Sequence, residues 1–352
     1  MSNLIDRLLR VCWIFILLAG GCVSPPASLH IQTKTPQLTS EPAPTLENLS
    51  PTETNQPTAV ATTFSKPTAE QPIISISPTP TLIPALFSGC EQSVCYTPFK
   101  GILKLPVPQG DNQNVEPSYR YGTTQNGERI PHEGVEFYAL FGSPVLAAQD
   151  GVVLYAGNDE KNQWGRFTNF YGNLIIVKHT LSTFSQPVFT LYAHLSEILV
   201  NTGDSVQAGE KIGEVGASGS AMGSHLHFEV RLDQSGLQNI QNPELFLELK
   251  NNSNKKTGIL VGRVFSEFTS QTSQILVIQK IENGTLQTNQ ALYLETYAAN
   301  IPSNAQLNEN FVISNLPAGQ YRISTFIEER FFESYIFIEE NTLTFINLNL
   351  EE

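Results

Sequence analysis

Polar and apolar side chains alternate over residues 225–230, which read His-Leu-His-Phe-Glu-Val. Successive side chains of a β-strand point to opposite faces, so a strand here places His225, His227 and Glu229 on one face and three apolar residues on the other. The pattern predicts a polar site supported by a hydrophobic layer. Five of the six histidines lie between positions 132 and 227, which gathers metal-binding and acid–base side chains in one region.

A second alternating segment, His-Glu-Gly-Val-Glu-Phe, begins at His132. An extended backbone places His132 and Glu136 on one face, so imidazoles and a carboxylate from the two segments can converge. Two imidazoles and one carboxylate without a thiolate leave a fourth position for water, which is typical of a catalytic zinc site rather than a structural one. We expect Glu229, on the same face as the ligands, to support them or to pair with a base such as Arg231.

Two further histidines remain for acid–base chemistry. Residues 188–194 read as a strand whose polar face ends in His194. His225 lies two residues from His227 on the same face of its strand, about 7 Å along it. We expect His179, a single histidine at the end of an apolar strand, to be a hydrogen-bonded structural residue.

Five linked motifs occur in order over residues 132–244. They are His-Glu-Gly-Val-Glu at 132–136, Asp-Gly-Val-Val at 150–153, Tyr-Ala-His at 192–194, Gly-Asp-Ser-Val-Gln-Ala-Gly at 203–209, and Gly-Ser-His-Leu-His-Phe-Glu at 223–229. In order and spacing this region resembles the LytM/lysostaphin-type zinc peptidases, the M23 peptidases that cut peptide bonds in bacterial cell walls. The chain departs from the family pattern at Glu136, where the family has aspartate. Glutamate carries the same carboxylate on one more methylene and also serves as a zinc ligand.

The resemblance implies a zinc endopeptidase that hydrolyses peptide bonds of peptidoglycan in cell-wall remodelling. One Zn²⁺ per chain would be held by His132, Glu136 and His227, while His194 and His225 would be catalytic. His225, close enough to reach a water on the metal, is our choice of general base. His194 would orient that water or stabilise the tetrahedral oxyanion. The alternative is a catalytically silent LytM-type module that binds wall peptides or activates another hydrolase. Bond cleavage separates the two hypotheses, since a bound zinc need not be catalytic.

The first residues predict export. Two arginines precede an apolar run over residues 11–19, which is too short to span a bilayer as a helix but suits a signal peptide. Residues 19–22, Ala-Gly-Gly-Cys, resemble a bacterial lipoprotein processing site. Cys22 would then carry a lipid that anchors the protein to the membrane, extracytoplasmically in the cell envelope. Simple secretory cleavage is the alternative, because Ala19 replaces the leucine often found there.

Residues 1–21 would thus form the signal peptide, followed by a linker over residues 22–87 that is rich in Pro, Thr and Ser. A segment without apolar periodicity cannot bury enough surface to offset chain entropy, so we expect it to be disordered. Cys90 and Cys95 follow, and in an exported protein a pair at this spacing favours a disulfide. Two reduced thiols are the alternative.

Short apolar runs separated by Gly-containing turns predict an all-β chain. Residues 88–249 are expected to form an antiparallel β peptidase domain, and residues 250–256 a polar spacer. Residues 257–352 alternate strands and turns, and Asn-Leu-Pro-Ala-Gly-Gln-Tyr at 315–321 resembles the carboxypeptidase regulatory-like, transthyretin-type β-sandwiches. This second region has neither histidine nor cysteine, so we expect it to position or bind rather than catalyse.

Two other function classes fit poorly. The net charge of −13, with 20 Lys and Arg against 33 Asp and Glu, argues against a nucleic-acid partner. The hairpin near 203–209 also resembles biotinyl and lipoyl carrier domains, but Lys211 does not sit at a hairpin tip in the required context. Peptidoglycan peptides remain the expected partner.

Overall fold

The computed structural model describes residues 93–184, 186–232, 239–251, 254–265, 273–327 and 329–350. All described residues lie within one compact unit of the chain. Within these ranges no helix combines the length and apolarity that crossing a bilayer requires. The expectations for the signal peptide, Cys22 and the linker lie outside the described residues. Cys95 is disulfide-bonded, but Cys90 lies outside them too, so its pairing stays a prediction.

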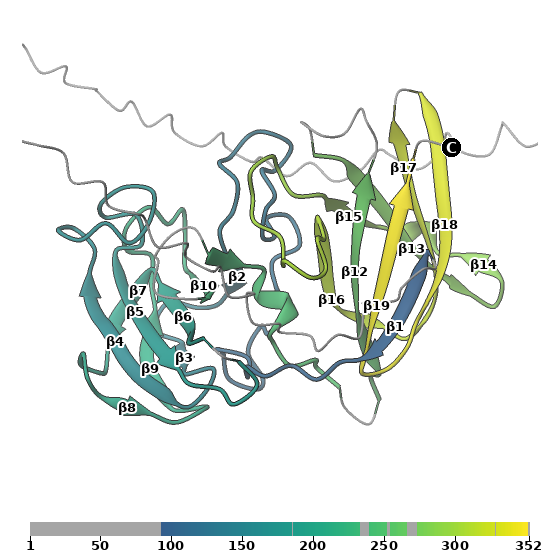
Figure 1. Ribbon diagram of the computed structural model, residues 1–352. Coiled ribbons are helices and arrows are strands. Elements are labelled where there is room, and N and C mark those ends of the chain that lie inside the picture. The colour runs from purple at the N-terminus through teal and green to yellow at the C-terminus, as the bar shows by residue number, and fades with distance from the viewer. Residues whose placement is uncertain are drawn as a thin grey trace, which may run out of the picture. The chain divides into compact units, whose positions relative to one another are not determined.

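Strands are nearly the only regular secondary structure in the described residues, which confirms the predicted all-β class. Short 3-10 helices occur at η2 (Pro243–Leu245) and η3 (Thr288–Gln290). The first half of the described chain builds two antiparallel sheets (Figure 1). The larger has the order β11-β10-β6-β5-β4-β8, with β2 also paired to β10, and the smaller has the order β3-β9-β7.

The bounds of these strands are β2 (Val135–Tyr138), β3 (Pro144–Leu146), β4 (Gly151–Asn158), β5 (Asn173–His179), β6 (Val188–Ala193), β7 (Leu195–Ile198), β8 (Ser205–Val206), β9 (Lys211–Val215), β10 (His225–Leu232) and β11 (Ile240–Gln241). Strand β10 is central to the larger sheet because β6 pairs along one edge while β2 and β11 share the other. Its position brings three segments of the chain to one place.

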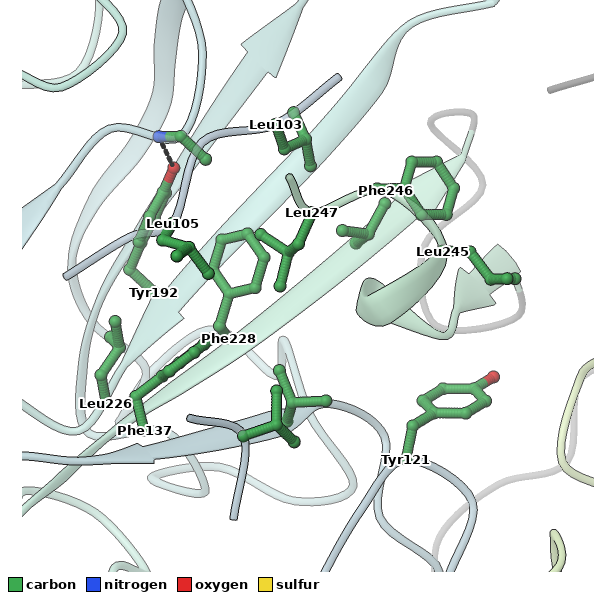
Figure 2. Close-up of a cluster of buried hydrophobic side chains, with 14 of the residues drawn as sticks. Leu103, Leu105, Tyr121, Phe137, Tyr192, Leu226, Phe228, Leu245, Phe246 and Leu247 are labelled. Atoms are coloured by element: carbon green, nitrogen blue, oxygen red, sulfur yellow. Dashed lines mark hydrogen bonds between the residues drawn. The ribbon is translucent and has the colours of Figure 1, made fainter. Parts of the chain in front are cut away.

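The apolar face of β10 is buried as the alternation predicts. Leu226, Phe228 and Val230 are fully buried in a hydrophobic cluster. The Phe228 ring lies 6.5 Å from the ring of Phe137 and 5.3 Å from that of Tyr192, both edge-on (Figure 2). Edge-on aromatic pairs of this kind are favourable beyond the area that they bury. The layer beneath the polar face is therefore rigid.

The C-terminal residues form two further sheets, ordered β1-β19-β12-β16 and β14-β13-β17-β18, with β15 paired to β13. Their bounds are β1 (Val94–Pro98), β12 (Thr257–Phe265), β13 (Ile275–Glu282), β14 (Thr285–Leu286), β15 (Leu292–Glu295), β16 (Phe311–Pro317), β17 (Gly319–Ile327), β18 (Arg330–Ile338) and β19 (Thr342–Asn349). Both sheets contribute to one apolar cluster, the first through residues such as Leu260 and Ile346 and the second through residues such as Leu276 and Ile323.

Strand β1 belongs to the C-terminal sheet although it precedes the histidine region. Val94 pairs with Ile346 and Pro98 with Thr342, antiparallel, and Figure 1 shows the two strands side by side. β1 lies inside the range 88–249 that we expected for the peptidase domain. The segment between β1 and β12 is thus joined at both ends to the same sheet.

A buried ion pair links the histidine region to β16. Arg120 Nη1 lies 2.6 Å from Glu244 Oε1, and the Glu244 side chain is completely buried. The other oxygen of Glu244 accepts hydrogen bonds from the backbone N–H of Ser314 at 2.8 Å and from its hydroxyl at 2.7 Å. One carboxylate therefore satisfies a buried cation and two donors from a strand seventy residues away.

Residues 119–132, which we call the ligand loop because they end at His132, are held by the strand end at Glu295. The Glu295 carboxylate accepts hydrogen bonds from Thr124 Oγ1 at 2.6 Å, from Thr124 N at 3.1 Å and from Asn126 N at 3.2 Å. Because Glu295 is buried, these bonds replace its lost hydration. The C-terminal part of the chain thereby fixes the middle of the loop.

Gly122 is a second point of attachment in the ligand loop. Its carbonyl accepts from Ala298 N at 2.7 Å, and its N–H donates to His132 O at 2.8 Å. Its φ of +80° lies in the left-handed region, and a Cβ there would stand 2.5 Å from the Tyr297 ring. Glycine is required at this position for both reasons.

Glu244→Ala is expected to lower the free energy of unfolding by about 3–5 kcal/mol, because it leaves the Arg120 charge buried without a partner. The measurement is urea denaturation of the full chain followed by intrinsic fluorescence. Glu340→Ala is the matched control, since it breaks the exposed pair with Lys256 and should cost less than about 1 kcal/mol. Equal losses in the two variants would contradict the prediction.

Burial raises the pKa of Glu309 to about 8 from an ordinary 4.5, against hydrogen bonds from Asn304 N and Tyr297 that lower it. The folded state therefore holds a proton that the unfolded state releases above pH 4.5. The stability that this bound proton contributes is fully present below pH 4.5. The free energy of unfolding should then fall as pH rises towards 8, by up to about 1.4 kcal/mol per pH unit.

Glu309→Gln should remove that slope, so the difference in unfolding free energy between wild type and variant should change over the same pH interval. Urea denaturation at a series of pH values measures it. Parallel pH profiles for the two proteins would show that Glu309 does not titrate in this way.

Candidate metal centre

The register of β10 brings the predicted ligands together. His227 stands directly opposite Glu136 on β2 and opposite Ala193 on β6. His194 follows Ala193 at once, so two strands and the residue after a third bring Glu136, His227 and His194 together from distant parts of the sequence. The predicted alternation of β10 is thus the feature that positions the site.

His132 reaches the site by a different route from the one expected. We predicted extended backbone from His132 onward, but β2 begins only at Val135, and residues 133 and 134 form a bend. Gly134 lies against β10, where a Cβ would stand 2.6 Å from Phe228 O. The bend therefore needs glycine, and it turns His132 towards His227 without strand geometry.

Two histidine nitrogens face each other at the centre of the site. His132 Nε2 lies 3.1 Å from His227 Nδ1. Two nitrogens bound to one tetrahedral zinc at about 2.0–2.1 Å would be roughly 3.3 Å apart. Glu136 Oε1 lies 3.9 Å from His132 Nε2, which is longer. In the part of the chain that the structure describes, no three His, Cys, Asp or Glu side chains already surround a common metal position.

The protonation of these two rings follows from their other hydrogen bonds. His132 Nδ1 lies 2.8 Å from the carbonyl oxygen of Tyr119, and His227 Nε2 lies 2.9 Å from the Glu229 carboxylate. Since these oxygens only accept, each contacting nitrogen carries the proton. When both rings are neutral, the two facing nitrogens both present lone pairs, which repel each other unless a cation lies between them. This donor set fits a metal ion.

Glu229 is the partner that orients His227. Its carboxylate also accepts from Arg231 Nε at 2.7 Å and from the Tyr171 hydroxyl at 2.5 Å. Burial alone would raise its pKa, but the Arg231 charge and the His227 hydrogen bond lower it to about 2. Glu229 therefore stays ionised and does both things expected of it, supporting a ligand and pairing with Arg231.

His194 and His225 lie beside the ligands as neutral imidazoles. Their rings are 4.9 Å apart, and each Nδ1 donates to a backbone carbonyl, that of Ser218 for His194 and of Gly223 for His225, both at 2.9 Å. Burial lowers the pKa of His194 to about 3 and also lowers that of His225. Each Nε2 is left as a proton acceptor.

His194 has unusual backbone geometry. Strand β6 ends at Ala193, and His194 has a φ of +62° in the left-handed region, where residues with a side chain are uncommon. The hydrogen bond from its N–H to Tyr171 O at 3.0 Å holds it there. Such strained positions cluster at functional sites. Because β6 ends at Ala193, the prediction that the strand extends to His194 was wrong by one residue.

A cleft of about 700 Å³ opens beside His225. It is lined by Gly110, Asp111, Asn112, Arg129, Glu136, Tyr138, Ala139, Leu140, Ser143, Met222, Gly223, Ser224 and His225. Sequence reasoning missed Arg129 and Tyr138 here, as well as Tyr119, whose ring stacks on the His132 ring at 4.1 Å and 7°. Arg129 and Tyr119 lie in a loop and have no periodicity that would have marked them, whereas Tyr138 lies two residues after Glu136 on β2 and so on the face that the alternation indicates.

His179 is remote from this chemistry, as expected. It is fully buried, and its ring nitrogens are hydrogen-bonded to Asp150 O at 2.9 Å and to Thr190 Oγ1 at 2.7 Å. Both polar atoms are satisfied, which is the usual state of a buried structural histidine.

Known proteins resemble part of the chain. Peptidoglycan DD-endopeptidase ShyC of Vibrio cholerae is 37% identical over 131 residues, which is 37% of this chain and 27% of that protein. The uncharacterized lipoprotein YgeR of Escherichia coli is 38% identical over 111 residues, which is 32% of this chain and 37% of that protein. The chain thus spans well under half the length of these curated relatives.

Among solved structures, the catalytic domain of the antimicrobial peptidase lysostaphin from Staphylococcus simulans is 27% identical, with a TM-score of 0.28. The similarity covers 42% of this chain and 88% of that one. Residues 130–240, which include His132, Glu136, His194, His225 and His227, match the sequence model of Peptidase family M23.

Proposed function

We propose that the chain is a zinc-dependent endopeptidase that hydrolyses peptide bonds of peptidoglycan. The observation that carries this proposal is the pair of ring nitrogens, His132 Nε2 and His227 Nδ1, that face each other at 3.1 Å, with the Glu136 carboxylate and the rings of His194 and His225 around them. The match of residues 130–240 to Peptidase family M23 supports the same reaction. The name of ShyC, a peptidoglycan DD-endopeptidase, supports the same substrate.

In this proposal His132 through Nε2, His227 through Nδ1 and Glu136 through a carboxylate oxygen hold one Zn²⁺. The ligand set contains no thiolate and leaves one position open, which suits a catalytic rather than a structural ion. Bound zinc supplies a water of lowered pKa and polarises the carbonyl that is attacked.

His225 is the general base of the proposal. Its Nε2 is an acceptor that lies 3.6 Å from Glu136 Oε1, close to the ligand set. Because its pKa is lowered, mainly by burial, His225 is neutral near pH 7 and can take a proton from the attacking water. Its Nδ1–H bond to Gly223 O keeps the ring oriented for this step.

His194 has a narrower role than the two we considered from the sequence. With its Nδ1 proton engaged by Ser218 O, its Nε2 can accept a hydrogen bond but has no proton to donate. Orienting the water is therefore favoured over stabilising the negatively charged oxygen of the tetrahedral state. Tyr119 packs on His132 and keeps that ring in place.

For the whole chain we propose a lipid-anchored protein of the cell envelope. Residues 1–21 would be removed as a signal peptide, Cys22 lipidated, and residues 22–87 would tether the peptidase part to the membrane. YgeR of Escherichia coli is named a lipoprotein. A disulfide between Cys90 and Cys95 fits this location, and Cys95 is disulfide-bonded.

We further propose domain boundaries at 88–249 for the peptidase part, 250–256 for the spacer and 257–352 for a transthyretin-type β-sandwich completed by β1. The shared apolar cluster of the two C-terminal sheets supports the sandwich. Its attachment to the ligand loop through Glu295 supports a positioning role.

A catalytically silent module that binds wall peptides or activates another hydrolase is the second candidate. It is favoured by one observation, the 3.9 Å between Glu136 Oε1 and His132 Nε2, which places the carboxylate outside ready ligand geometry. Retention of His194 and His225 beside the ligands favours the enzyme instead.

Purified peptidoglycan incubated with the zinc-loaded protein should release fragments with new peptide-bond termini, which mass spectrometry detects. His225→Ala should lower the rate at least about 100-fold, because the base that takes the proton is removed. Its zinc content and circular dichroism should match those of the wild type. No release by folded, zinc-loaded wild type from several wall chemistries would instead support the silent module.

Glu229→Gln should weaken zinc binding about 10- to 100-fold, because the amide no longer fixes the His227 tautomer as an ionised carboxylate does. Competition with a chromophoric chelator measures the affinity. Glu214→Gln is the matched control, since Glu214 pairs with Lys211 on β9. Wild-type affinity in the Glu229 variant would refute the role assigned to this carboxylate.

A further inference from the structure

Arg129 is the one Lys or Arg among the residues that line the cleft beside His225, whose lining also holds the carboxylates of Asp111 and Glu136. Arg129 is half-buried and lines this cleft together with Glu136, Tyr138 and Met222. Lys and Arg are outnumbered by Asp and Glu in the whole chain, 20 against 33. A cation at this position is therefore not a result of the overall composition.

Aromatic stacking holds the Arg129 side chain in place. Its guanidinium carbon lies 4.3 Å from the centroid of the Tyr119 ring. The imidazole of His132 lies parallel to the same ring at 4.1 Å and so occupies one face. The guanidinium therefore lies over the other face, separated from the first proposed ligand by the thickness of one ring. A planar guanidinium is well suited to such a contact.

The hydrogen-bonding capacity of Arg129 is largely unused by the protein. A guanidinium has five N–H donors, and Arg129 Nη2 donates to Met222 Sδ at 3.0 Å, a weak acceptor on a side chain that is 84% exposed. Four other arginines of the described ranges pair with a carboxylate, namely Arg120, Arg166, Arg231 and Arg322. Within the same ranges, no carboxylate lies at ion-pair distance from Arg129.

We propose that Arg129 binds a free carboxylate of the substrate and thereby selects cross-links that carry one next to the cleaved bond. The proposal rests on the endopeptidase function proposed above. In a cross-link the nitrogen of the cleaved amide comes from the side chain of a diamino acid. When that acid is diaminopimelate, the carbon bonded to this nitrogen also bears a carboxylate.

The distances involved are compatible with this assignment. A carboxylate oxygen three bonds from the nitrogen lies roughly 3–3.5 Å from it, given bond lengths of about 1.2–1.5 Å. An anion so close to the reacting carbonyl falls within reach of a guanidinium one ring away from the ligand set. Arginine binds carboxylates through two parallel N–H···O bonds, so its binding depends on the position and orientation of the carboxylate as well as on its charge.

The test compares two synthetic cross-linked peptides that differ only in whether the diaminopimelate carboxylate next to the cleaved amide is free or amidated. The wild type should cleave the free form about 10- to 100-fold more efficiently in kcat/KM, as expected for a hydrogen bond between charged groups. Arg129→Gln should bring the ratio of the two kcat/KM values close to one. Arg129→Lys should retain part of the preference, because it keeps the charge but not the fork geometry.

Each other outcome is decisive. If the wild type cleaves both peptides equally well, or if Arg129→Gln lowers both rates by the same factor, Arg129 supports the loop through Tyr119 and does not bind the substrate. The inference would then be overturned while the endopeptidase function stands. If the zinc-loaded wild type cleaves neither peptide nor peptidoglycan, the proposed function fails and the inference falls with it.

Discussion

The buried charge of Glu229 is the constraint on which the arrangement of the centre depends. A carboxylate removed from water is strongly unfavourable unless its oxygens are satisfied, and here Arg231, Tyr171 and His227 supply three donors. Satisfying Glu229 requires the proton of His227 to be on Nε2. Nδ1 is then an acceptor and points towards His132. The electrostatics of one buried side chain thereby determine which nitrogen the proposed metal ligand can offer.

The C-terminal sheets take part in this arrangement although they contribute no candidate ligand. The ligand loop has no strand pairing of its own between residues 119 and 132, so its conformation depends on what holds it. Glu295 and Ala298 form hydrogen bonds with its backbone. Near its start, Arg120 pairs with Glu244, whose carboxylate also accepts a hydrogen bond from Ser314. His132 stands at the end of this loop. The C-terminal part therefore fixes the backbone of the loop that ends at His132, which is consistent with the positioning role proposed for it.

The sequence was sufficient to predict those parts of the site that follow from the alternation of side chains along one strand. The alternation at 225–230 sufficed to place His225, His227 and Glu229 over an apolar layer, because strand parity is a property of the backbone. It did not reveal the bend at Gly134, which results from close contact with β10, a strand ninety residues away. Nor could it reveal the pairing of β1 with β19, or Glu295 holding Thr124. Each of these depends on contacts between distant segments and leaves no pattern in either segment alone.

The replacement of aspartate by Glu136 can be understood from the same register. Glu136 is fixed opposite His227, so the length of its side chain decides where the carboxylate lies. Its Oε1 is 3.9 Å from His132 Nε2 and 3.6 Å from His225 Nε2, between a proposed ligand and the proposed base. Oxygen and nitrogen ligands of one tetrahedral zinc would be roughly 3.4 Å apart. The carboxylate therefore needs to move by about half an ångström, and the additional methylene supplies the torsional freedom for a shift of that size.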